Sequence, residues 1–223
     1  MDQTQWKAVD DYIVDLFGLH DPILEAALAA SDEAGLPSIQ VTPSQGKMLA
    51  ILVQAVGARK ILEIGTLGGY SAIWMARALP AGGCLVSLEA APRHAEVARA
   101  NIARAGLSDV VEIRVAPAIE TLPRMVEAGE GPFDLVFIDA DKPNTTGYFE
   151  WALKLTRPGS MIIADNAIRN GDIITAESTD PSVQGMRAAN AAIAGSPRVT
   201  ATCVQTVGSK GYDGFTVALV KPE

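Results

Sequence analysis

The sequence predicts an α/β fold in which a doubly wound, mostly parallel sheet of seven strands carries helices on both faces. Three observations lead to this prediction. From about residue 59 onward, short apolar segments alternate with segments of helical spacing. The connections between them are short, and repeated strand–helix units with short connections form parallel sheets. The apolar segments are nearly continuous, which is typical of strands that are buried on both faces.

The individual elements follow from these patterns. We expect strands at "KILEI" (60–64), "CLVSL" (84–88), "VVEIRV" (110–115), "FDLVFI" (133–138) and "SMIIAD" (160–165). Helices are expected between and after them, over residues 70–79, 93–106, 118–129 and 148–156. Beyond residue 198, two further strands, 199–208 and 214–220, are joined by "SKGYD", a pattern typical of an antiparallel hairpin.

The first 56 residues differ from the rest because they read as helical throughout. Breaks are expected at Pro22, at 35–37 and at 42–43, where proline or glycine interrupts the pattern. No repeat or linker divides the chain, so we expect a single domain over residues 1–223 with an N-terminal helical appendage of about residues 1–56. The appendage also carries more apolar side chains than one domain need cover, namely Trp6, Val9, Tyr12, Ile13, Leu16 and Phe17. We therefore expect a homodimer, the commonest symmetric assembly.

Composition and charge narrow the function. The chain is 48% hydrophobic and 20% charged, as globular proteins are, and it has no apolar run of about 18 residues that would predict a membrane span. An acidic, amphipathic N-terminus does not predict a signal peptide, and the distant Cys84 and Cys203 favour a reduced, cytoplasmic compartment. The net charge of −8 makes a nucleic-acid partner unlikely in this interpretation. The only histidines, His20 and His94, are expected at the surface, which disfavours a Ser-His-Asp or Cys-His enzyme.

The ends of the predicted strands carry the chemistry. In doubly wound sheets, ligands bind beyond the carboxyl ends of the strands. Five consecutive strands end in polar or glycine-containing segments, which are Glu63–Gly69, Glu89, Ala116–Ala118, Asp139 and Asp165-Asn166. The repetition of this pattern predicts a binding site along that edge of the sheet.

The loop "EIGTLGGYS" (63–71) and Glu89 indicate the kind of ligand. The loop lacks the G-x-G-x-x-G spacing of a dinucleotide fingerprint, and the charge of Glu63 disfavours a pyrophosphate and favours a ligand with a cationic part. Glu89 can accept both hydroxyls of a ribose, as acidic residues at this strand end do in nucleotide-binding folds. A ribose without pyrophosphate, beside acidic groups, points to S-adenosylmethionine.

Four motifs together resemble a known family. They are "LEIGTLGGYS", "LEAAP", "FIDADK" and "IIADNAIRNG", which stand in the order and at the spacing of the cation-dependent class I O-methyltransferases, the caffeoyl-CoA and catechol O-methyltransferase family. The resemblance runs from about residue 40 to the C-terminus. The segments "TPSQGKML" and "GSKGYDGF" are similar to those of its small bacterial members. The resemblance implies a Rossmann-like fold and S-adenosylmethionine as cofactor.

The resemblance also implies roles for individual residues. Glu63, Gly65, Thr66 and Ser71 would hold the methionine end and the backbone side of the cofactor, Glu89 the ribose, and Ala118 would lie near the adenine. Val41 would line the cofactor from the appendage. A divalent metal would be held by Asp139, Asp165 and Asn166, with Asp139 also counted among the cofactor-contacting and catalytic residues. Lys142 would act as general base.

The chemistry of these residue types agrees with the implied metal. Two carboxylates and an amide oxygen are hard ligands that suit Mg²⁺, Mn²⁺ or Ca²⁺ better than a zinc site. Asp139 and Asp165 end strands that we expect to be neighbours, about 5 Å apart, so that one ion can bridge them. Such an ion can chelate two vicinal oxygens of a catechol and lower the pKa of a phenolic hydroxyl from about 10.

The sequence therefore predicts an S-adenosylmethionine- and metal-dependent O-methyltransferase that acts on vicinal hydroxyls of small catechol-like aromatics such as phenylpropanoids and flavonoids. Two alternatives remain at this point. One is methylation of a hydroxyuridine in tRNA, which the negative charge disfavours. The other is a non-catalytic S-adenosylmethionine-binding protein, which would need no metal ligands. Asp141 is left without a role.

Overall fold

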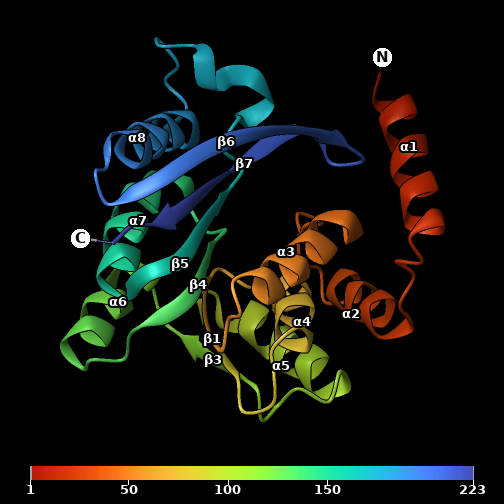
Figure 1. Cartoon of the computed structure of the whole chain (residues 1–223). Helices are drawn as coiled ribbons and strands as arrows, with labels where there is room; N and C mark the ends of the chain where they lie inside the picture. The colour runs from red at the N-terminus through yellow and green to blue at the C-terminus, as the bar shows by residue number, and fades with distance from the viewer. Residues whose placement is uncertain (1, 223) are drawn as a thin grey trace.

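The computed structural model describes residues 2–222 and is built around one seven-stranded sheet (Figure 1). The strand order is β3-β2-β1-β4-β5-β7-β6, with β1 to β5 parallel and β7 antiparallel to both of its neighbours. The strands are β1 (Lys60–Ile64), β2 (Cys84–Glu89), β3 (Val111–Val115), β4 (Phe133–Ile138), β5 (Thr156–Asp165), β6 (Val199–Gly208) and β7 (Gly211–Val220). The predicted fold class is confirmed, whereas residues 1 and 223 of the predicted domain lie outside the described residues.

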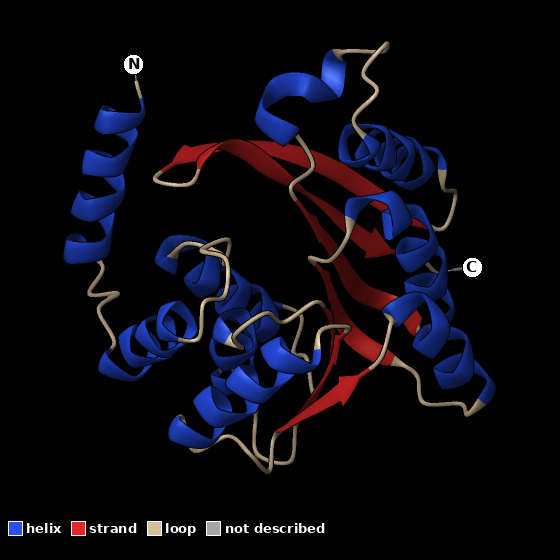
Figure 2. Cartoon of the chain, turned by 180° about the vertical axis from the view of Figure 1, so that it is seen from behind, coloured by secondary structure: helices blue, strands red, loops and turns tan. Residues whose placement is uncertain are grey.

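Helices cover both faces of this sheet (Figure 2). They are α1 (Gln3–Leu16), α2 (Pro22–Glu33), α3 (Pro43–Ala55), α4 (Tyr70–Arg77), α5 (Pro92–Arg104), α6 (Ala118–Glu127), α7 (Thr145–Lys154) and α8 (Pro181–Gly195), with 3₁₀ turns η1 (Lys142–Asn144) and η2 (Arg169–Ile174). Apolar side chains of α2, α3, α4 and α5 form one buried core with the sheet. Those of α6, α7 and the end of α8 form a second core on the opposite face. None of these helices combines the length and the apolar character that crossing a membrane requires.

A buried carboxylate fixes the amino-terminal edge of the sheet, opposite the predicted site. Asp134 of β4 accepts hydrogen bonds from the backbone N–H groups of Arg59 (2.8 Å) and Lys60 (3.0 Å) and from the Arg157 guanidinium (2.6 Å). Burial alone would raise the pKa of Asp134, but these donors together hold it below its usual value. The three strands β1, β4 and β5 are thereby aligned where they begin.

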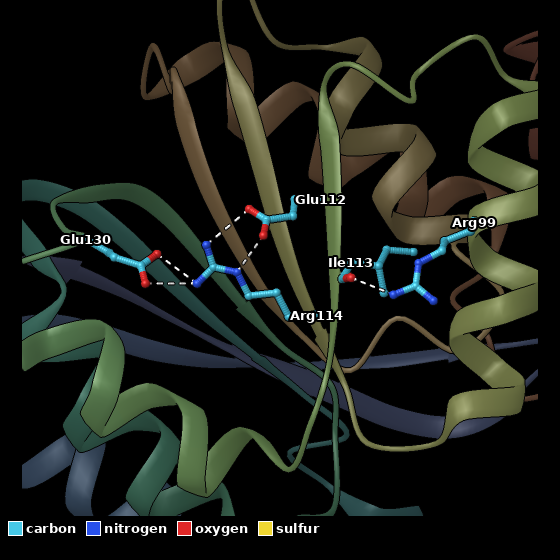
Figure 3. Close-up of polar contacts among 5 residues, drawn as sticks. All are labelled: Arg99, Glu112, Ile113, Arg114 and Glu130. Carbon is cyan, nitrogen blue, oxygen red and sulfur yellow. Dashed lines mark hydrogen bonds and ion pairs between the residues drawn. The ribbon is translucent and has the colours of Figure 1, made fainter. Parts of the chain in front are cut away.

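Strand β3 is an edge of the sheet, and an arginine contacts its backbone while a second arginine forms ion pairs beside it (Figure 3). Arg99 of α5 reaches over the edge and donates to the Ile113 carbonyl at 2.8 Å. Arg114 binds Glu112 on the same strand and Glu130 in the loop before β4, at 2.8 Å from each. Covering an edge in this way leaves fewer free donors and acceptors for another chain to pair with.

The helices of the predicted appendage are held to different degrees. Helix α1 has no buried residue, and both views of the chain show it beside the end of the β6–β7 hairpin (Figures 1 and 2). Helix α2, in contrast, packs on the loop after β1 through the fully buried Asn101, whose amide donates to the carbonyls of Ala27 (3.1 Å) and Gly68 (2.8 Å). The appendage thus supports the predicted cofactor loop.

Several elements differ from the sequence-based expectations. Strand β7 begins at Gly211 rather than at residue 214, and α7 begins at Thr145 rather than at residue 148. Helix α8 is not among the expected helices, although its buried side chains recur at helical spacing, namely Val183, Met186, Ala189 and Ile193. Strand β5 begins at Thr156 rather than at residue 160, although Pro158 and Gly159 interrupt the apolar pattern. A register irregularity opposite Phe133 to Leu135 accommodates them, and proline and glycine are tolerated at such bulges.

Candidate active site

A cavity of about 690 Å³ opens at the carboxyl ends of the strands, where β1 and β4 lie side by side and the chain order of the sheet reverses. This is the position at which doubly wound sheets bind ligands. The predicted site residues that line it are Val41, Gly65, Thr66, Ser71, Glu89, Ala118, Asp139, Lys142 and Asn166. The structure therefore brings together residues that are up to 125 positions apart in the sequence.

Gly65 allows the two central strands to end against each other. The sheet ladder continues past β1 and β4, because Gly65 N–H donates to Leu88 O at 2.8 Å and Asp139 N–H donates to Ile64 O at 2.9 Å. Gly65 has a φ of 89°, and a Cβ at this residue would lie 2.2 Å from the Asp139 carbonyl oxygen. Only glycine fits this approach, which sets the loop after β1 beside Asp139.

Glu89 anchors the loop that it faces. Its Oε2 accepts the backbone N–H groups of Thr66 (3.2 Å) and Leu67 (2.9 Å), and its Oε1 accepts that of Ala91 (2.9 Å). Because a carboxylate offers about four acceptor positions, Glu89 keeps capacity for a further donor from the cavity. The side chain that is predicted to bind the ribose therefore also shapes the loop around it.

Glu63 lies behind the cavity wall. It is fully buried and does not line the cavity, and its two carboxylate oxygens accept the hydroxyl groups of Ser71 and Ser87, each at 2.6 Å. Burial raises its pKa to about 7, although the hydroxyl donors act in the opposite direction. The structure thus places Glu63 in contact with the cavity wall through Ser71.

Asp139, Asp165 and Asn166 lie at the ends of the neighbouring strands β4 and β5, as the sequence predicts. Asp165 is buried, and burial together with the negative charge of Asp139 raises its pKa to about 7. Asn166 follows in the left-handed region with a φ of 58°, and its N–H donates to Asp165 Oδ1 at 2.8 Å. Two carboxylates that repel each other at a buried site are stabilised by a cation between them.

The donor set fits a hard divalent cation. Among residues 2–222, no three His, Cys, Asp or Glu side chains gather into a metal-binding cluster. A cation at the ends of β4 and β5 would therefore be held by two carboxylates and one amide. Mg²⁺ commonly binds through one or two carboxylates and takes its other ligands from water or substrate. Asp139, Asp165 and Asn166 would hold the ion, which leaves coordination positions for an acceptor.

Lys142 and Asp141 both follow β4 but make different contacts. The Lys142 ammonium is 2.8 Å from Asp139 Oδ1, and its side chain is only 12% exposed at the cavity wall. Asp141 instead accepts hydrogen bonds from the hydroxyl of Tyr148 and the amide of Asn144. Burial and the neighbouring Asp141 carboxylate raise the pKa of Tyr148, which keeps its hydroxyl protonated as a donor. Asp141 therefore shapes the turn that presents Lys142.

A second cavity of about 460 Å³ adjoins the first and has Asp165 and Asn166 in its wall. Its sides come from α1, the segment 38–45 and the β6–β7 hairpin. The hairpin tip is tied to both neighbours, because Ser209 N–H donates to Asp10 at 2.7 Å and the Lys210 ammonium donates to Ser38 O at 2.8 Å. The predicted metal ligands thus lie between a large cofactor-sized cavity and a smaller one.

Sequence reasoning did not identify all residues of the site. His20 is exposed as expected, with 63% of its side chain accessible, and His94 has 29% accessible, but that its surface position would be in the cavity wall was not predicted. His94 is half-buried, lines the larger cavity and has Nδ1 3.5 Å from Glu89 Oε1, because α5 begins directly beyond the end of β2. Arg169 also lines this cavity, and its position after Asn166 was the only available signal.

Comparisons with known proteins agree with this geometry. A model of the O-methyltransferase family matches residues 19–220. The chain belongs to this family. It is also 53% identical to the catechol O-methyltransferase of Niastella koreensis, over 99% of this chain and 100% of that protein.

Solved structures of the family are similar throughout. The O-methyltransferase from Bacillus cereus, solved in complex with SAH, superposes with a TM-score of 0.97 at 54% identity and covers 99% of this chain and 100% of its own. The O-methyltransferase TomG from Streptomyces achromogenes, which is involved in tomaymycin synthesis and was solved with SAM, gives a TM-score of 0.95 at 46% identity with both chains fully covered. This chain is therefore an O-methyltransferase with the Rossmann-like fold of the class I enzymes.

The burial of Glu63 predicts a pH-dependent contribution to stability. Between the ordinary pKa of 4.5 and about 7, the folded protein binds a proton at Glu63 that the unfolded chain has released. The contribution of Glu63 to the free energy of unfolding therefore falls as the pH rises through this window. In urea unfolding of the metal-free proteins, the free energy of unfolding of wild type should fall relative to that of Glu63→Gln as the pH rises from about 5 to about 8. The exposed Glu96→Gln serves as control, and a pH-independent difference between wild type and Glu63→Gln would contradict the assignment.

Proposed function

We propose that this S-adenosylmethionine-dependent O-methyltransferase uses a divalent cation to methylate one of two vicinal hydroxyls on small catechol-like aromatics, such as phenylpropanoids or flavonoids. The observation that carries the proposal is the position of Asp139, Asp165, Asn166 and Lys142 between the two adjoining cavities. Cofactor binding alone would not require this set of ligands and a buried ammonium.

Different residues of the site would have different roles in methyl transfer. Gly65, Ser71 and Glu89 lie on the β1 and β2 side of the larger cavity, where they would orient the cofactor. A divalent cation bound at Asp139, Asp165 and Asn166 would lower the pKa of the acceptor hydroxyl. Lys142 lies beside Asp139, where its neutral amine, once it has released its own proton, would accept the hydroxyl proton as the oxygen attacks the methyl group and the cofactor leaves as S-adenosylhomocysteine. The partly enclosed cavities would limit the access of water to this step.

The relatives support the acceptor class. The Niastella koreensis relative carries the name catechol O-methyltransferase, and maize relatives that are 37% and 36% identical over 58% of this chain are named caffeoyl-CoA O-methyltransferases. Both names describe aromatic acceptors. We extend this class to the present chain because its two carboxylates and amide suit the chelation of two adjacent oxygens.

We further propose a homodimer formed through α1 and a cytoplasmic location. Large apolar side chains on α1 and just after it are exposed, namely Val9 (49%), Tyr12 (63%), Leu16 (60%) and Phe17 (69%). A second copy would remove them from water, and apolar burial is the main driving force of association.

The free, exposed Cys84 and Cys203 are compatible with a reducing compartment.

The first prediction from the proposed function tests the acceptor class and the metal requirement together. Methyl transfer should occur with catechols, flavonoids or hydroxycinnamoyl thioesters, should stop after treatment with EDTA, and should return with Mg²⁺ or Mn²⁺. Asp165→Asn should reduce Mg²⁺ binding in calorimetry, because it removes one of the two anionic ligands. Full activity without metal would contradict the metal role, and activity only on hydroxyuridine tRNA would replace the acceptor class.

The second prediction concerns Lys142. Lys142→Met should lower kcat by about 10²-fold, at the lower end of the range for a general base, because the metal also activates the hydroxyl. Higher pH should restore part of the loss as the phenol ionises without help. Lys142→Arg should not rescue the enzyme, because a guanidinium does not release its proton in this range. Wild-type kcat in either variant at saturating Mg²⁺ would show that Lys142 is not the base.

The third prediction concerns assembly. Light scattering at micromolar concentration should give the mass of two chains, and Tyr12→Ser with Phe17→Ser should shift the protein toward a monomer because it removes apolar contact area. The exposed polar substitution Lys7→Gln on the same helix is the control. A wild-type monomer at this concentration would refute the dimer.

A further inference from the structure

Arg169 is a cation of the larger cavity that no other described residue engages. It lines the cavity with Lys142, Asn166 and Ser182, and its Nε is buried without a hydrogen-bond partner. Within residues 2–222, its guanidinium takes part in no ion pair, whereas Lys142 is paired with Asp139 at 2.8 Å. A buried donor without a partner is costly, and such groups are found where a ligand completes the hydrogen bonding.

The backbone holds Arg169 in an unfavourable conformation. Its φ is 53°, in the left-handed region that residues other than glycine, asparagine and aspartate seldom adopt, and Asn170 follows with a φ of 57°. Asp213 of β7 stabilises this turn, because its Oδ1 accepts the N–H groups of Ile168 (2.9 Å), Arg169 (3.0 Å) and Gly214 (2.9 Å). Glycine would adopt the same backbone without strain. An arginine at this position therefore indicates that its side chain has a function in the cavity.

The place of Arg169 indicates which ligand it meets. It follows β5 by four residues and lies with Ser182 of α8, on the β5 side of the cavity. Gly65, Ser71 and Glu89, which are predicted to hold the cofactor, come from the β1 and β2 side. Asn166, a predicted metal ligand, lies three residues before Arg169 on the same turn. Arg169 is therefore positioned for the acceptor rather than for the cofactor.

We propose that Arg169 binds a carboxylate on the acceptor and selects vicinal dihydroxy aromatic acids over neutral catechols. A guanidinium presents parallel N–H donors that match the two oxygens of a carboxylate, which gives both affinity and orientation. The aromatic ring would extend between two fixed points, its hydroxyls at the metal ligands and its carboxylate at Arg169. This inference rests on the proposed function, since it assumes that the hydroxyls bind at Asp139, Asp165 and Asn166.

The test compares a charged and a neutral acceptor that otherwise differ by one methyl group, 3,4-dihydroxycinnamate and its methyl ester. Binding is measured by calorimetry with Mg²⁺ and S-adenosylhomocysteine present, and turnover is measured in parallel with S-adenosylmethionine. In Arg169→Gln, we expect at least about tenfold weaker binding and a raised KM for the acid, because a charge-assisted pair is lost. The ester should change less than about threefold, and Arg169→Lys should retain part of the preference because it keeps the charge.

Two controls separate this role from a structural one. Arg124→Gln, at an exposed position on α6, should leave both acceptors unchanged. The affinity for S-adenosylmethionine should be the same in Arg169→Gln as in wild type. Equal losses for acid and ester, or weakened cofactor binding, would overturn the inference. Arg169-dependent binding of the acid without turnover of either acceptor would support this inference and refute the proposed function.

Discussion

At the carboxyl ends of β1 and β4, the backbone of Gly65 passes so close to Asp139 that a Cβ on residue 65 would lie 2.2 Å from the carbonyl oxygen of Asp139. This contact brings the loop that is predicted to face the cofactor and the first predicted metal ligand to one point of the sheet. Glu89 then fixes the same loop from β2 by accepting two of its N–H groups. The remaining site residues are placed relative to this junction, since Asp165 lies on the strand next to Asp139.

Two carboxyl groups with a pKa raised to about 7 show how differently the chain treats buried acids. Burial is the largest cause of the raised pKa in both, and the charge of Asp139 adds to it in both. They differ in their surroundings. Glu63 is enclosed behind the cavity wall, where two serine hydroxyls donate to it and only partly offset the effect of burial. Asp165 lies at a strand end next to that of Asp139 and in the wall of the smaller cavity, an arrangement that suits a cation.

Much of the fold could be read from the sequence because parallel strands buried on both faces are continuous apolar runs. The strand-end positions of Asp139, Asp165 and Asn166 followed from that reading, because all parallel strands end at one edge. The beginning of β5 could not be read in this way, since Pro158 and Gly159 interrupt its apolar pattern. Helix α8 does carry apolar side chains at helical spacing, but the many alanines between them weaken the contrast between its two faces. His94 was hidden for another reason, because its place depends on contacts between segments that are distant in sequence. Arg169 and Asp213 lie inside the segments "IIADNAIRNG" and "GSKGYDGF", but the sequence did not indicate that the two residues meet.

The two cavities are lined by different parts of the chain. The residues predicted to hold the cofactor come mainly from β1, β2 and the loops after them, in the first half of the chain. The smaller cavity, in contrast, is lined by α1, segment 38–45 and the β6–β7 hairpin. These segments are far apart in the sequence and are joined by tertiary contacts such as the hydrogen bond from Ser209 N–H to Asp10. Asp213 on that hairpin also holds the turn that carries Arg169. Changes in the hairpin can therefore alter both the wall of the smaller cavity and the turn that places Arg169 in the wall of the larger one, while the Gly65–Asp139 junction stays intact.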